Sequence, residues 1–137
     1  MKTITLYRPV GLKEMELIAI CDYTRFPPRL SWQPIFYPVM NQQYAEQIAK
    51  EWNTVDEFSR YCGIVTSFEV NKDYLSRFEI QNVGDKTHNE LWIPSEEMNL
   101  FNDNIVGEIR IVNAFFGSQY KISPLEDIEN RLMKFKK

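Results

Sequence analysis

Apolar and polar positions alternate along this chain with two different periods. A period of two residues is typical of a β-strand, and a period near 3.6 residues is typical of an amphipathic helix. The first period predicts strands at residues 3–8, 35–40, 63–70, 77–83, 89–93 and 107–116. The second predicts helices at residues 11–21, 41–53, 95–101 and 123–137.

Prolines and small polar residues mark the expected ends of these elements. Pro9 is expected to stop the first strand, because proline cannot donate to a sheet ladder. Asn41 is a good N-cap for the second helix. Residues 123–126 (SPLE) match a capping box with proline at the first helical position. Ile80 in the fourth strand and Leu125 in the last helix are expected to face the core.

The order of the elements predicts an α+β fold. Six short strands are expected, with helices early and late and a strand-rich middle. Strands that follow one another from Gly63 onward imply antiparallel pairing. We therefore predict a compact, mixed arrangement of largely antiparallel sheets with flanking helices. At 137 residues the chain is expected to be a single domain over residues 1–137, with residues 123–137 as its C-terminal helix.

Composition excludes several classes of protein. The net charge of −3 argues against a nucleic-acid binder, which needs a basic surface. No apolar run approaches the roughly 20 residues that a membrane span requires, and the N-terminus has no signal-peptide core. One histidine and two isolated cysteines argue against a zinc site of these ligands, and no metal site is predicted, although composition leaves a carboxylate-bound Mg²⁺ open. The two unpatterned cysteines fit a reducing compartment, and a cytoplasmic location is expected.

The segment from His88 to Ile93 holds the candidate catalytic residues. On a strand, His88, Glu90 and Trp92 point to one side, and Leu91 and Ile93 point to the core. A carboxylate beside an aromatic ring and a histidine then faces a cleft or solvent. The alternative is a solvated strand face on which Glu90 has a cross-strand partner.

Arg8, Arg29 and Tyr37 are the candidate binding residues. Arg8 shares a strand face with apolar neighbours, so its charge must reach water, pair with a carboxylate or bind a ligand. Two prolines stiffen the loop that positions Arg29, and such loops often carry function. Tyr37 is either a core residue with a satisfied hydroxyl or part of a site.

Several runs of this sequence resemble a family of short bacterial proteins labelled "ADP-ribosylation/crystallin J1". The resemblance covers roughly residues 3–112 and rests on LYRPVGLKEMELI, FPPR, QPIFYPVMNQQYAEQIAKEWN, ELWIPSEEMNLFN and NIVGEI. The glycohydrolases that carry the crystallin J1 name are larger and all-helical, so their fold is not expected here. The order of elements is instead similar to the ADP-ribosyltransferase fold.

That similarity implies a role for each candidate. Arg8 would hold NAD, Tyr37 would stack on its nicotinamide ring, and Glu90 would stabilise an oxocarbenium-like transition state. Two departures leave the acceptor open: residues 36–38 (FYP) replace the serines of the second strand, and His88 stands two residues before Glu90. The resemblance therefore implies an enzyme that uses NAD, with a protein as one of the acceptors that remain open. The alternative is a noncatalytic nucleotide- or protein-binding module on the same scaffold.

Overall fold

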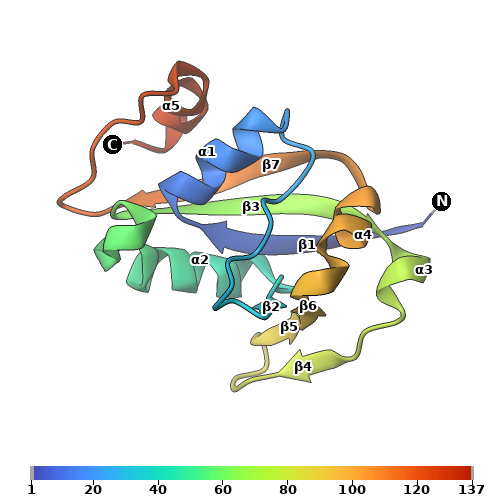
Figure 1. Cartoon of the computed structure of the whole chain (residues 1–137). Helices are drawn as coiled ribbons and strands as arrows, with labels where there is room; N and C mark the ends of the chain where they lie inside the picture. Colours follow the sequence, from blue (N-terminus) through green and yellow to red (C-terminus); the bar gives the residue numbers. More distant parts are fainter. Residues whose placement is uncertain (1, 137) are drawn as a thin grey trace.

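A three-stranded antiparallel sheet forms the centre of the protein (Figure 1). The computed structural model describes residues 2–136. The strands lie in the order β1 (Thr3–Val10), β3 (Cys62–Asn71) and β7 (Ile105–Phe116). Helices α1 (Leu12–Ile20) and α2 (Gln42–Glu51) cover opposite faces of this sheet, so β3 is buried along almost its whole length.

Two short strand pairs extend the structure beyond the free edge of β1. They are β2 (Ile35–Phe36) with β6 (Ile93–Pro94), and β4 (Ile80–Asn82) with β5 (Asn89–Leu91), all antiparallel. Val39 joins them to the central sheet. Its backbone exchanges hydrogen bonds of 2.9 and 2.8 Å with Tyr7, and it bridges to Glu90 on its other side. Val39 therefore brings β5 alongside β1.

The remaining elements are short helical segments. They are the α-helices α3 (Lys72–Leu75), α4 (Met98–Asp103) and α5 (Glu126–Leu132), and the 3₁₀ turns η1 (Asn53–Val55), η2 (Glu57–Ser59), η3 (Ser95–Glu97) and η4 (Met133–Phe135). The main core lies on the α1 side of the sheet, where Phe26, Phe36, Phe68 and Phe101 meet at ring-centroid distances of 4.8 to 6.2 Å. A smaller core under α2 packs Ala45 and Ala49 against Val65.

The structure confirms the predicted α+β class and its antiparallel pairing. Asn41 caps α2 as expected, since its side chain accepts a hydrogen bond from the backbone N–H of Tyr44 at 3.1 Å. Leu91 and Ile93 are buried, as the period of the strand predicts.

Pro9 does not end the first strand, which continues to Val10. Tyr7 directs its backbone N–H toward Val39 and away from β3, and Pro9 lies two residues further on, so its nitrogen faces the same side. Among the described residues, that side of β1 has no neighbouring strand beyond Tyr7. A proline costs no ladder hydrogen bond at such an edge.

Two other expectations are wrong. The strand predicted at residues 77–83 shrinks to β4, where Ile80 is 59% exposed because this pair stands outside both cores. The capping box does not form: α5 begins at Glu126, and Leu125 is its N-cap without a side-chain bond. The hydroxyl of Ser123 donates to Glu16 on α1 instead. The C-terminal helix is thus shorter than residues 123–137, and residue 137 lies outside the described residues.

Candidate functional site

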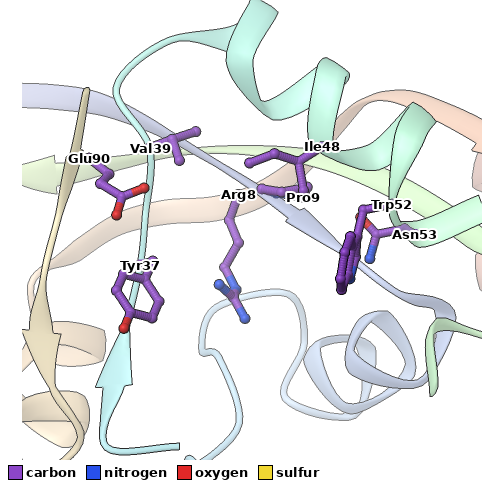
Figure 2. Close-up of a pocket in the computed structure, with 8 residues that line it drawn as sticks. All are labelled: Arg8, Pro9, Tyr37, Val39, Ile48, Trp52, Asn53 and Glu90. Carbon is purple, nitrogen blue, oxygen red and sulfur yellow. The ribbon is translucent and has the colours of Figure 1, made fainter. Parts of the chain in front are cut away.

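A cavity of about 380 Å³ lies beside the free edge of β1 (Figure 2). Its walls come from β1, from the segment after β2, from β5 and from the end of α2. The lining residues are Arg8, Pro9, Tyr37, Val39, Ile48, Trp52, Asn53 and Glu90. The cavity lies where no strand of residues 2–136 pairs with this edge of β1 beyond Tyr7, while α2 packs on β1 and Val39 links β5 to it.

Three of the residues predicted from the sequence meet in this cavity. Arg8 comes from β1, Tyr37 from the turn after β2, and Glu90 from β5, which lies more than 80 residues away from Arg8 in the sequence. Figure 2 shows Glu90 and Tyr37 on one wall, with Trp52 on the opposite wall and the Arg8 side chain between them. The structure therefore brings together one cation, one carboxylate and two aromatic rings.

Glu90 is a buried carboxylate whose hydrogen-bond donors are all neutral. It is only 8% exposed. One carboxylate oxygen accepts from the indole N–H of Trp92 at 2.8 Å, and the other from the hydroxyl of Tyr44 at 3.3 Å. Within residues 2–136 it forms no ion pair. Burial, and then the negative charge of Glu90, raise the pKa of Tyr44, which stays a donor.

His88 does not line the cavity. Its ring stacks on the ring of Tyr44 with a centroid distance of 4.2 Å and an interplanar angle of 14°. Its Nε2 lies 3.3 Å from the side-chain oxygen of Gln47 on α2. His88 thus touches a residue that holds Glu90, and not the cavity itself.

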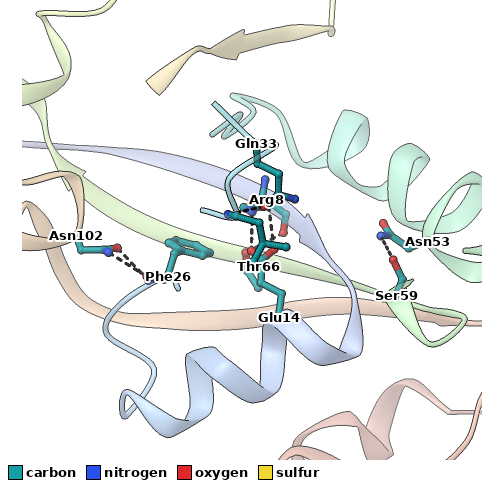
Figure 3. A network of polar contacts seen from close by, with 9 residues as sticks. Arg8, Glu14, Phe26, Gln33, Asn53, Ser59, Thr66 and Asn102 are labelled. Carbon is teal, nitrogen blue, oxygen red and sulfur yellow. Dashed lines mark hydrogen bonds and ion pairs between the residues drawn. The ribbon is translucent and has the colours of Figure 1, made fainter. Parts of the chain in front are cut away.

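Arg8 is bound by a carboxylate from the next element. Its Nε and one Nη donate to Glu14 at 2.7 and 2.9 Å, as Figure 3 shows. Both side chains are largely buried, at 12% and 19% exposure. The guanidinium carbon lies 4.5 Å from the centroid of the Phe36 ring. The structural ion pair considered from the sequence is therefore present, and Arg8 still lines the cavity.

Tyr37 is a wall residue and not a core residue. It is 42% exposed, and its ring meets Trp92 edge-on at a centroid distance of 6.4 Å. Trp92 thereby contacts both Tyr37 and the carboxylate of Glu90.

Arg29 lies next to the cavity, on a loop that the structure holds firmly. The side chain of Asn102 bonds both the N–H and the C=O of Phe26, at 2.9 and 3.0 Å (Figure 3). Arg29 follows three residues later, with its guanidinium carbon 5.5 Å from the centroid of the Phe36 ring. It lines a second cavity, of about 420 Å³, between this loop and α4.

Sequence reasoning missed Glu14 as a partner of Arg8. The signal was the short turn at Gly11, which sends α1 back over β1. A side chain at Gly11 would meet the Cα of Ser59 at 2.5 Å, so only glycine fits this close approach. The first turn of α1 then presents Glu14 to Arg8.

Comparisons with known proteins find no relative of this chain: no protein-family model, no curated protein and no solved structure matches it. Within residues 2–136, no group of three or more histidine, cysteine or acidic side chains is placed to hold a metal ion. Over the same residues, no helix has the length and apolar character that crossing a membrane requires.

Proposed function

We propose that this protein binds NAD in the cavity beside β1 and cleaves its nicotinamide–ribose bond, as an ADP-ribosyltransferase-like enzyme. The observation that carries the proposal is the convergence of Arg8, Tyr37 and Glu90 on one cavity from three separate elements. Spacing in the sequence does not require this convergence. A site that binds both the cationic ring and the anionic part of one ligand needs such a set of groups in one place.

The electrostatics of the cavity favour a ligand with a cationic end. The charge of Arg8 is balanced by Glu14, whereas Glu90 receives only neutral donors. A buried carboxylate without a cation favours a positive group placed beside it. The nicotinamide ring of NAD is a cation, and the aromatic ring of Tyr37, on the same wall as Glu90, favours a cationic ring beside it.

The same carboxylate fits the charge that develops during the reaction. When the bond between the ribose carbon and the pyridinium nitrogen breaks, its electron pair goes to nicotinamide, which leaves as a neutral molecule. Positive charge then remains on the ribose, where Glu90 stabilises it electrostatically. A hydroxyl, amine or water forms the new bond to that carbon and releases its proton to solvent.

A second candidate function is NAD binding without turnover. It is favoured by the commitment of two Arg8 nitrogens to Glu14, and by His88 standing outside the cavity. In this case the site recognises a nucleotide and holds no group that activates an acceptor.

The test combines calorimetry with NAD and a nicotinamide-release assay. For the enzyme we expect saturable binding and nicotinamide release that Glu90→Gln lowers by about 10²- to 10³-fold, since one electrostatic group in a transition state has this weight. Glu51→Gln is the matched control, because Glu51 is exposed at the end of α2 and does not line the cavity. Binding without release supports the second candidate. Absence of both would overturn the assignment of NAD.

A further inference from the structure

Arg29 is a largely enclosed arginine with no acceptor of its own. Its Nε is buried, and no acceptor on residues 2–136 lies within hydrogen-bond distance of that atom. Within the same residues Arg29 also has no ion pair. Buried polar groups normally have partners, so an unpaired guanidinium nitrogen beside a cavity points to a ligand.

Arg29 and Arg8 stand together against one aromatic ring. Their guanidinium carbons lie 5.5 and 4.5 Å from the centroid of the same Phe36 ring. Glu14 is the one carboxylate that pairs with either of them among the described residues, and it takes two nitrogens of Arg8. Two positive charges and one negative charge leave this corner of the molecule with a net charge of +1.

The two arginines differ in how much of their hydrogen-bonding capacity is in use. Arg8 donates through Nε and one Nη to Glu14, and its other Nη has no partner within residues 2–136. Arg29 keeps its whole planar fork. A guanidinium fork of this kind matches the paired oxygens of phosphate and carboxylate.

We propose that Arg29, assisted by the remaining Nη of Arg8, binds a phosphate group, and that this subsite holds the diphosphate of the nucleotide whose cationic ring lies near Glu90. This inference rests on the proposed function for the identity of the nucleotide. It gives the main anion contact to the loop arginine and leaves Glu14 as the residue that positions Arg8.

The loop is built to hold Arg29 in place before a ligand arrives. Asn102 fixes the backbone of Phe26, and the two prolines at 27 and 28 restrict the chain between Phe26 and Arg29. Burial lowers the pKa of the Arg29 guanidinium, and the positive charge of Arg8 lowers it further. A bound anion would offset both costs, because it supplies acceptors to Arg29 and negative charge beyond that of Glu14.

The test is calorimetric titration of the full chain with inorganic diphosphate. We expect Arg29→Gln to weaken diphosphate binding by about 10- to 100-fold, the range for losing charge-assisted hydrogen bonds. Arg25→Gln is the matched control. Arg25 lies four residues earlier on the same loop, lines the same 420 Å³ cavity as Arg29 and carries the same charge, but its guanidinium is already occupied by Asp103 at 2.8 Å. We expect Arg25→Gln to bind diphosphate within about twofold of the unmodified chain, as usual for an exposed pair.

Three results would overturn the subsite. The first is that the unmodified chain does not bind diphosphate, and the second is that Arg29→Gln binds it as tightly as the unmodified chain. The third is that Arg29→Gln and Arg25→Gln lose the same affinity, because equal losses would indicate only a diffuse effect of charge. If Arg29→Gln does not fold, Arg29→Lys takes its place: it keeps the charge and loses the fork, so we expect a loss of about 5- to 20-fold.

Further experiments distinguish a failure of this proposal from a failure of the proposed function, and they identify the source of the phosphate. Glu90→Gln is expected to leave diphosphate binding unchanged. The unmodified chain is also tested with NAD. If it binds diphosphate through Arg29 but neither binds NAD nor releases nicotinamide, the phosphate subsite is supported and the assignment of NAD is wrong. ADP-ribose should compete with diphosphate if both use Arg29, whereas independent binding would overturn the link to a nucleotide.

Discussion

Two glutamates, the buried Glu90 and the partly buried Glu129, lie in regions of the molecule with opposite character. Glu129, on α5, accepts hydrogen bonds from the hydroxyl of Tyr120 at 2.5 Å and the backbone N–H of Ser123 at 2.6 Å. It also pairs with Lys136 at 2.5 Å. Glu90 has two neutral donors, no ion pair within residues 2–136, and a cavity beside it.

The difference separates a structural carboxylate from one that is available to a ligand. A buried carboxylate is stabilised only when its oxygens find donors and its charge finds a partner. Both conditions are met inside the protein at Glu129, which fastens the C-terminal segment to the core. At Glu90 the oxygens have donors, but the charge has no partner within residues 2–136. The negative charge of Glu90 is therefore available to a ligand in the cavity.

The largest expected effects come from neutralising each glutamate in turn. Glu90→Gln should lower nicotinamide release by about 10²- to 10³-fold and leave the melting temperature nearly unchanged, because glutamine keeps the shape and accepts from one donor. Glu129→Gln should have the opposite effects. Nicotinamide release per folded molecule should be unchanged, and the free energy of unfolding should fall by about 1–3 kcal/mol, because Lys136 and Tyr120 lose their shared partner. Urea titration and the release assay measure both. A loss of release in both variants would contradict the comparison.

Stability should depend on pH through the C-terminal region. Burial raises the pKa of Glu129, but the hydrogen bonds from Lys136 and Tyr120 outweigh it, so the pKa lies below its ordinary 4.5. A lowered carboxyl pKa stabilises the fold above pH 4.5, and this contribution is lost as the pH falls through the folded value. Burial raises the pKa of Cys62 from 9.0 to about 12, so stability should also fall as the pH rises from 9 toward 12.

The measurement is urea unfolding across the pH range, with Glu129→Gln as the control. The unmodified chain should be most stable between about pH 5 and 9. The variant should lose part of the decline below pH 4.5 and keep the alkaline decline. Identical acid limbs in the two proteins would show that Glu129 is not the group responsible.

A smaller effect is expected from the neutral donor that holds Glu90. Trp92→Phe removes the indole N–H that bonds Glu90 at 2.8 Å and keeps a ring next to Tyr37. We expect kcat/KM for nicotinamide release to fall about 10- to 100-fold, the value of one hydrogen bond to a charged group. Trp52→Phe is the control, because Trp52 lines the same cavity without a hydrogen bond to Glu90. Equal losses would indicate that only ring size matters.

Periodicity in the sequence predicts what a single element decides by itself. It places Glu90 and Trp92 on one side of a strand and Leu91 on the other, and the structure confirms that arrangement. It also predicts the α+β class and the cap at Asn41, because these depend on local chemistry.

The remainder depends on contacts between distant elements. Pro9 stays in its strand because Val39 pairs with Tyr7 and, within residues 2–136, with no later residue of β1, which leaves the edge open at Pro9. Ser123 donates to Glu16, which lies more than 100 residues away in the sequence, and accepts from the backbone N–H of Leu125, so its hydroxyl closes a turn that precedes α5. Glu14 and Trp52 belong to the surroundings of the cavity only because α1 and α2 fold back toward β1. No spacing along the chain encodes those approaches.

The smallest effect is expected from His88, although it shares a strand side with Glu90. Its ring stacks on Tyr44 and does not line the cavity, so it reaches Glu90 only through the 3.3 Å bond of the Tyr44 hydroxyl. His88→Gln should therefore change kcat/KM by less than about threefold, since the Trp92 bond remains and one aromatic stack contributes modestly. The pH profile of nicotinamide release should keep its shape around neutrality. A loss of about 10²-fold or more would instead make His88 a general acid or base and move the reacting atoms toward Tyr44.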